Sequence, residues 1–329
     1  MLKYKMQFVI VLAVILLLSA LPVVGGETWR LEQGRDFKPV SPEGKDKYLL
    51  TVAQIKKLVV TGQTEQAGEA FDKLKKDFPE IAGPDLDAFI KGEMLFCKGK
   101  FTKAVRAYDK FLRQYPESEL YEAALDRKFA IATAFLAGQR IPVLGIFKMK
   151  GYASGVKIME RISDSAGDAP IAKKAAVAVA ESYEKRRKFN EAYYKWSEIL
   201  SRWPTGPMGR DALLSMARCK HAVYRGPKYD ASNLISAKSY YENFRLRHPE
   251  DAAKIDVDGR LKQIDEQLAY KHFSIGRYYQ KTGNEQSANL YYQMVLDNWP
   301  DSSAAKMAKT AMDAEKSSDK KEKNEKRIP

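Results

Sequence analysis

The stretch Ile275–Ser302 reads IGRYYQKTGNEQSANLYYQMVLDNWPDS and contains the pattern that decides the fold. Ala288 and Tyr292 lie on one face of a helix, where the small alanine admits a neighbouring helix and the ring fills the space one turn later. Pro300 ends that helix, because proline lacks an N–H and disfavours helical geometry in Trp299 before it. The stretch therefore predicts a helix with a point of close approach and a defined end.

The same register occurs five times along the chain. In each case an aromatic residue follows an alanine by four positions and a proline follows it by twelve: Ala67, Phe71 and Pro79; Ala104, Tyr108 and Pro116; Ala192, Trp196 and Pro204; Ala237, Tyr241 and Pro249; Ala288, Tyr292 and Pro300. A residue with a ring side chain also precedes each of these five prolines: Phe78, Tyr115, Trp203, His248 and Trp299. Five such registers predict five helices that end in the same way.

A partner helix precedes three of these helices. It has a small residue twelve positions before the alanine and a large residue three positions later: Gly92 with Leu95, Ala180 with Tyr183, and Gly276 with Tyr279. Short turns join the two helices. The repeating element is an antiparallel helix pair of about 34 residues, which resembles the tetratricopeptide repeat (TPR) family. We expect an all-α fold, a right-handed solenoid of about six TPR-like hairpins with a C-terminal capping helix.

The pattern also predicts how the chain is divided. Six repeats fall at about 44–79, 84–116, 119–169, 170–204, 207–249 and 255–300, within a solenoid that spans 44–315 and ends in a cap at 302–315. A signal peptide at 1–26 and an extended segment at 27–43 precede it. The charged segment 316–329 is low in complexity, so we expect a disordered tail there.

The first 26 residues have the anatomy of a secretory signal peptide. Lys3 and Lys5 precede the apolar run Phe8–Leu18, and the small pair Gly25 and Gly26 follows. We expect cleavage near this pair and an exported mature chain. The alternative is a signal that is retained as an anchor, although the apolar run is shorter than the roughly 20 residues of a membrane-spanning helix.

Composition narrows the class of partner. Charged residues make up 30% of the chain and the net charge is +14. A basic protein attracts anionic partners. Export argues against nucleic acid and directs attention to acidic protein surfaces, anionic lipid at a membrane surface, or peptidoglycan.

Several features go beyond the general repeat. They are the helix ends Tyr115-Pro116-Glu117-Ser118 and Trp299-Pro300-Asp301-Ser302, and the last full repeat from Ile264 to Ser302. They resemble the BamD (YfiO) family of outer-membrane barrel assembly lipoproteins. The resemblance implies a periplasmic scaffold on the inner face of the outer membrane, which binds the barrel-insertase subunit and unfolded outer-membrane proteins. That family is lipidated on a cysteine directly after the signal peptide, and Leu21–Gly26 contains no such lipobox cysteine.

The sequence favours binding over catalysis. His221, His248 and His272 lie far apart in the period, and no nucleophile elbow, phosphate-binding glycine loop or metal-ligand spacing is present. We therefore expect no enzyme activity, no catalytic residue, no metal site and no cofactor.

Candidate protein-binding residues come from the first helix of each pair and from two insertions. The groove positions that the TPR resemblance implies include Leu86, Phe89 and Phe96 in the second repeat and Tyr270, Phe273 and Arg277 in the sixth. We expect Phe89 and Phe96 to form an exposed apolar patch for an extended or helical peptide; packing against the segment Glu27–Val40 is the alternative.

The insertions lengthen the third and fifth repeats, and insertions in a solenoid project as loops along one face. Gln139–Gly151 is apolar and basic with no acid, and its Ile146 and Phe147 are candidates for contact with a partner or a membrane; packing on the solenoid is the alternative. The fifth repeat carries Gly226–Asp230, with Tyr229 as its candidate.

These features predict a non-catalytic periplasmic scaffold that binds protein and acts as an outer-membrane β-barrel assembly factor. The alternative is a cell-wall-associated TPR adaptor in envelope organisation or division.

Overall fold

We analysed a computed structural model of the chain, which describes residues 29–31, 37–39, 51, 54–55, 57–59, 61–79, 83–143 and 147–325. The chain divides into two compact units, Met1–Gly155 and Val156–Pro329, each of which is described by itself. The predicted signal peptide and the tip of the third-repeat insertion, with Ile146, lie outside the described residues.

The first unit contains helices that pair in sequence order. They are α3 (Thr64–Asp77), α4 (Pro84–Cys97), α5 (Phe101–Gln114), α6 (Tyr121–Leu136) and the start of α7 (Tyr152–Ser165). Two short antiparallel sheets accompany them: β1 (Trp29–Leu31) with β2 (Phe37–Pro39), and β3 (Arg140–Val143) with β4 (Phe147–Lys150). The insertion predicted as a loop is therefore a β-hairpin.

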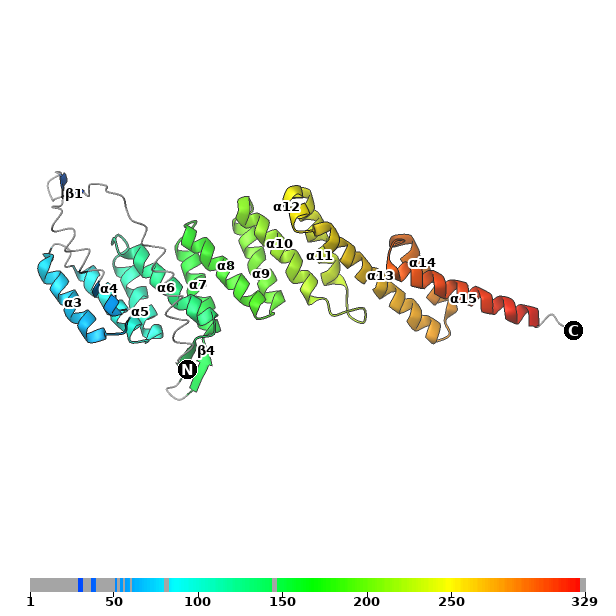
Figure 1. Cartoon of the computed structure of the whole chain (residues 1–329), viewed down its shortest axis with the longest axis horizontal. Coiled ribbons are helices and arrows are strands. Elements are labelled where there is room, and N and C mark those ends of the chain that lie inside the picture. Colours follow the sequence, from blue (N-terminus) through cyan, green and yellow to red (C-terminus); the bar gives the residue numbers. More distant parts are fainter. Residues whose placement is uncertain are drawn as a thin grey trace. The chain divides into compact units, whose positions relative to one another are not determined.

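The second unit continues with helical hairpins alone. Its helices are α8 (Pro170–Lys185), α9 (Phe189–Arg202), α10 (Gly206–Val223), α11 (Ser232–Arg247), α12 (Pro249–Lys254), α13 (Val257–Lys281), α14 (Glu285–Asn298) and α15 (Ser303–Glu325). Consecutive helices run up and down beside one another (Figure 1). The prediction of stacked TPR-like hairpins in an all-α fold is confirmed.

The proline positions set the helix ends as predicted. Each of the five helices with the alanine-ring-proline register stops two residues before its proline, as α9 does at Arg202 before Pro204 and α14 at Asn298 before Pro300. The ring residue between them leaves helical geometry, and its N–H donates to the carbonyl four residues earlier. Trp203 and Trp299 add a second bond: their indole N–H groups donate to Asp168 (2.8 Å), in the turn before α8, and to Asp265 (3.3 Å), on α13 of the same hairpin as Trp299.

The core follows the small-large pattern. All five alanines of the register are fully buried, and so are Tyr108 and Tyr292. Gly92 and Gly276 give these two rings room, because a Cβ at either glycine would lie 2.5 or 2.7 Å from a ring carbon. The repeated residues are therefore packing residues, as the spacing indicated.

Two features differ from the sequence prediction near the C-terminus. An additional short helix, α12, lies between the predicted fifth and sixth repeats. Asp256 then adopts the left-handed conformation (φ 54°) and separates α12 from α13. The segment predicted as a disordered tail continues α15 as far as Glu325. Lysine and glutamate have high helix propensity, so a helix can extend through this charged segment.

Candidate protein-binding surfaces

The groove positions of the second repeat lie on α4, and they are half-buried rather than exposed. The Phe89 ring centroid lies 6.0 Å from that of Tyr108 and 5.8 Å from that of Phe111. Phe96 packs on Phe101 at 5.5 Å. Leu86 is also half-buried. The expected open apolar patch is therefore largely covered by α5.

A buried polar network beside these rings escaped the sequence analysis. Glu93 on α4 accepts a bond from the Tyr108 hydroxyl (2.5 Å) and two from the Arg127 guanidinium (2.8 and 3.0 Å). Burial, followed by the Glu93 charge, raises the pKa of Tyr108 far above its ordinary value. Because the three residues come from α4, α5 and α6, the network joins one hairpin to the next. The only sign of this network in the sequence was an acidic residue, Glu93, directly after Gly92, where the two helices approach closely.

In the second unit, Lys271 of α13 brings two predicted binding elements together. Its ammonium donates to the backbone carbonyls of Pro227 (3.1 Å) and Tyr229 (2.7 Å), so the loop between α10 and α11 is held against α13. Tyr229 remains 54% exposed and Tyr270 42% exposed. Arg277 is also exposed on α13. Three of the predicted residues are thus available to a partner.

The prediction for Phe273 is wrong, because this side chain is only 5% exposed. Its ring centroid lies 5.6 Å from that of Tyr292, and it belongs to the cluster that α15 completes with Ala304, Ala305 and Ala308. The close approach of the capping helix buries a position that the TPR resemblance assigns to the groove.

A row of rings on α13 and α14 was also missed. The ring centroids of successive members are separated by 5.2, 6.2, 5.7 and 5.7 Å, in the order Trp299, His272, Tyr291, Tyr279 and Tyr278. Tyr278 is exposed and the other four rings are half-buried. Burial, followed by the charge of Lys271, lowers the pKa of His272, which favours the neutral ring within the stack. The spacing of seven between His272 and Tyr279 was the available signal.

The insertion in the third repeat places Phe147 at the start of β4, opposite Val143. Arg140, Met149 and Lys150 are exposed, and the two strands contact mainly each other. The Lys150 ammonium lies 5.6 Å from the Tyr152 ring centroid. The described part of the hairpin thus has exposed side chains on both strands.

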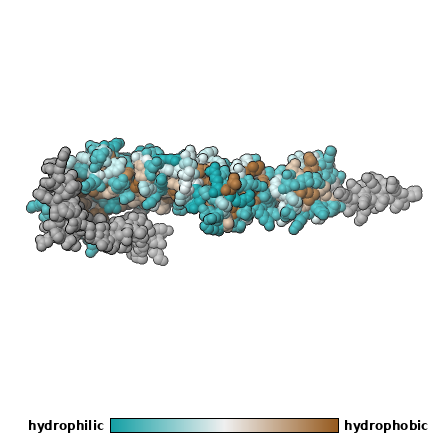
Figure 2. Space-filling model, turned by 90° about the horizontal axis from the view of Figure 1, so that it is seen from above, coloured by the Kyte–Doolittle hydropathy of each residue, from teal (hydrophilic) through white to brown (hydrophobic). Residues whose placement is uncertain are grey.

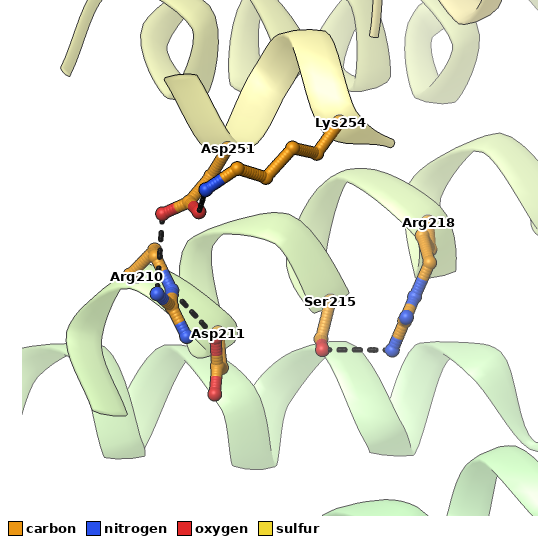
Figure 3. A network of polar contacts seen from close by, with 6 residues as sticks. All are labelled: Arg210, Asp211, Ser215, Arg218, Asp251 and Lys254. Carbon is orange, nitrogen blue, oxygen red and sulfur yellow. Dashed lines mark hydrogen bonds and ion pairs between the residues drawn. The ribbon is translucent and has the colours of Figure 1, made fainter. Parts of the chain in front are cut away.

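Charged side chains at the α10–α12 end pair with one another (Figure 3). The Arg210 guanidinium contacts Asp211 at 2.9 Å and Asp251 at 3.1 Å, and Asp251 also lies 3.7 Å from Lys254. This network joins α10 to α12 and has a structural role. In the face drawn in Figure 2, hydrophobic residues form separate spots in a mainly hydrophilic surface.

A cavity of about 260 Å³ lies between α7, α8 and α9, but its Lys195 is already paired with Glu160 (2.7 Å) and Glu198 (2.9 Å). Among the described residues, no group of three or more His, Cys, Asp or Glu side chains could hold a metal ion. None of the described helices combines the length and apolarity of a bilayer-spanning segment.

Comparison with known proteins gives a family for more than half of the chain. The model of the YfiO family, described as outer membrane lipoprotein, matches residues 148–327, and a tetratricopeptide repeat model matches residues 88–118. The chain is similar to the outer membrane protein assembly factor BamD of Rickettsia prowazekii (strain Madrid E), with 22% identity over 228 residues, 69% of this chain and 70% of the relative.

Two solved structures are also similar to it. The C-terminal part of a TPR repeat-containing protein from Cytophaga hutchinsonii is 16% identical and covers 80% of this chain and 95% of its own, with a TM-score of 0.34. The type IV pilus biogenesis factor PilW is 16% identical and covers 82% and 99%, with a TM-score of 0.27.

Proposed function

Because this chain belongs to the YfiO family of outer membrane lipoproteins, we propose that it is a non-catalytic periplasmic scaffold in outer-membrane β-barrel assembly. Its partners are the barrel-insertase subunit and unfolded outer-membrane proteins. The observation that carries the proposal is the family match over 148–327, which spans the helices α7 to α15 and the loop that Lys271 holds. The similarity to an assembly factor over 228 residues supports the same role.

The surface that we assign to partners is formed by Tyr229, Tyr270 and Arg277. Exposed tyrosines supply large amphipathic contact area at low cost in side-chain entropy, and arginine adds directional hydrogen bonds. The loop that carries Tyr229 is anchored through its own carbonyls, so binding there loses little conformational entropy. These features suit recognition of a polypeptide.

Site-specific photocrosslinking in cells tests the proposal. A photoreactive amino acid at Tyr229, Tyr270 or Arg277 should capture the insertase subunit or a nascent barrel protein. The matched control is Leu290, which is exposed on α14 of the same hairpin and should give weaker capture. If none of the three positions captures either class of partner, the proposal is wrong.

The net charge of +14 favours one competing function, a TPR adaptor associated with the cell wall. Peptidoglycan carries carboxylates that a basic surface would attract. Sedimentation with purified murein that disappears at raised ionic strength, together with absent barrel crosslinks, would assign the chain to that class instead.

A further inference from the structure

The hydrogen-bond pattern of the β3–β4 hairpin determines which backbone groups face outward. The strands pair Arg140 with Lys150 and Pro142 with Lys148. Gly151 N–H donates to the Gln139 carbonyl at 2.9 Å, so this pair is a hydrogen-bonded one. Hydrogen-bonded and non-hydrogen-bonded pairs alternate along an antiparallel ladder. The N–H and C=O groups at positions 140, 142, 148 and 150 therefore point away from the partner strand.

Only one of the two outer edges offers a complete set of these groups. On β3 the outward position 142 is a proline, which has no N–H to donate. On β4 both outward positions, Lys148 and Lys150, carry an N–H and a C=O. Among the residues that the structure describes, no third strand pairs with either edge. The outer edge of β4 is thus an open template for another strand.

The side chains of β4 whose burial the structure describes are exposed. Lys150 is exposed, and Met149 beside it is 61% exposed. An isolated two-stranded hairpin is only marginally stable in water, and a third strand adds backbone hydrogen bonds and buried area. An added strand would therefore stabilise the hairpin while it is bound.

Charge selects the kind of strand that fits. The insertion Gln139–Gly151 contains three basic residues and no acidic one. A second copy of the same edge would place lysines opposite lysines, which is unfavourable across a ladder. An extended segment with acidic side chains has the opposite charge. We propose that the outer edge of β4 binds an extended, acidic polypeptide segment as a third strand.

This inference deepens the proposed function and rests on it. In that function the acidic extended segments are the unfolded strands of barrel precursors. It assigns strand capture to the insertion of the third repeat, and the tyrosine-lined surface of the second unit is a separate site.

Binding of a labelled peptide to the full chain tests the proposal. The probe is a fluorescein-labelled ten-residue peptide that alternates threonine with glutamate, followed by fluorescence anisotropy. Lys148→Pro removes an outward N–H of β4 and should weaken binding by up to about tenfold, since each lost edge bond is worth up to about one decade in affinity. The matched control is Arg140→Pro, which removes an outward N–H from the edge that Pro142 already blocks. It should change affinity less than twofold.

Two measurements need no variant. A peptide N-methylated at every residue has no N–H left to donate, and its methyl groups block both of its edges, so it should not bind. In residue-resolved hydrogen exchange, the unmodified peptide should protect the amides of Lys148 and Lys150 and leave that of Arg140 unchanged. Equal binding of the N-methylated peptide, or equal weakening by the two proline variants, would overturn the proposal.

The outcomes also separate this proposal from the proposed function. If barrel precursors still crosslink at Tyr270 while the acidic peptide fails to bind, only the strand-edge proposal falls. If the peptide binds at β4 but no barrel precursor is captured in cells, the assembly role falls and the strand site remains.

Discussion

Tyr108 and Tyr292 occupy the same position of the repeat but bond to different acceptors. The Tyr108 hydroxyl donates to the carboxylate of Glu93 at 2.5 Å, and the Tyr292 hydroxyl donates to the amide oxygen of Gln280 at 2.9 Å. Hydrogen bonds to charged groups contribute more to stability than bonds to neutral ones, and a buried carboxylate that loses a donor carries a desolvation cost.

Replacing each tyrosine by phenylalanine should reveal this difference. We expect Tyr108→Phe to lower the free energy of unfolding by about 1.5–3 kcal/mol and Tyr292→Phe by about 0.5–1.5 kcal/mol. Urea unfolding, analysed separately for the transitions of the two units, gives both values. Equal losses would mean that Arg127 alone satisfies Glu93.

Two histidines should make stability depend on pH. Burial is the main cause that lowers the pKa of His221 and of His272 from the ordinary value of 6.5. At His221 the hydrogen bond to the Gln267 amide oxygen opposes the shift and the charge of Arg260 adds to it, and at His272 the charge of Lys271 adds to it. The unfolded chain therefore binds more protons than the folded one as the pH falls below about 6.5, and the free energy of unfolding should decrease there.

Urea unfolding between pH 7.5 and pH 5.5 measures that decrease. His221→Gln should remove the contribution of this histidine to the pH dependence. The free energy of unfolding of the variant should therefore change less steeply with pH, whatever its absolute value. A slope that is unchanged in the variant would show that His221 does not contribute.

Close packing between the two helices of a pair depends on a single hydrogen atom at Gly276. A Cβ there would lie 2.7 Å from a ring carbon of Tyr292. We expect Gly276→Ala to destabilise the second unit by about 1–3 kcal/mol through overpacking. The control is Gly68→Ala in α3, where the new Cβ would make an ordinary 3.5 Å contact with Met94. Helix propensity should make that change stabilising by up to about 1 kcal/mol, and thermal melts compare the two.

The turn between α8 and α9 contains strain that the equivalent turns avoid. Arg187 adopts φ 59°, whereas Gly99 and Gly283 occupy the same place in other hairpins at φ 66° and 76°. An L-residue with a Cβ pays about 1 kcal/mol in the left-handed region. We expect Arg187→Gly to raise the stability of the second unit by up to about that amount in denaturant unfolding. Gly283→Arg, the reverse change, should lower it.

The last helix closes the core of the second unit, and its removal tests how the array ends. Ala304, Ala305 and Ala308 are buried against Tyr292 and Val295. A chain that stops after Ser302 should lose roughly 2–5 kcal/mol, the range for large-to-small core changes, and should aggregate through the exposed core. A chain that stops after Ala314 keeps these contacts and should melt like the full chain. Equal melts for both truncations would show that α15 is not a cap.

The sequence by itself determined the repeat, the helix ends and the core residues, because each depends on local chemistry. Proline stops a helix whatever surrounds it, and residues four apart share a face in any helix. The TPR resemblance supplied Tyr270 and Arg277 and the insertion in the fifth repeat supplied Tyr229, and all three side chains are exposed. The family resemblance drawn from the last repeat agrees with the family match over 148–327.

Only the tertiary structure decided which side chains from different helices meet. Glu93 and Arg127 are 34 positions apart in the chain, and nothing local pairs them. Phe273 has the spacing of a groove residue, yet the approach of α15 buries it. The insertion of the third repeat pairs its two ends into strands, which gives it an edge that its composition does not reveal. Local patterns fix the elements, whereas contacts between elements depend on distances that no spacing along the chain contains.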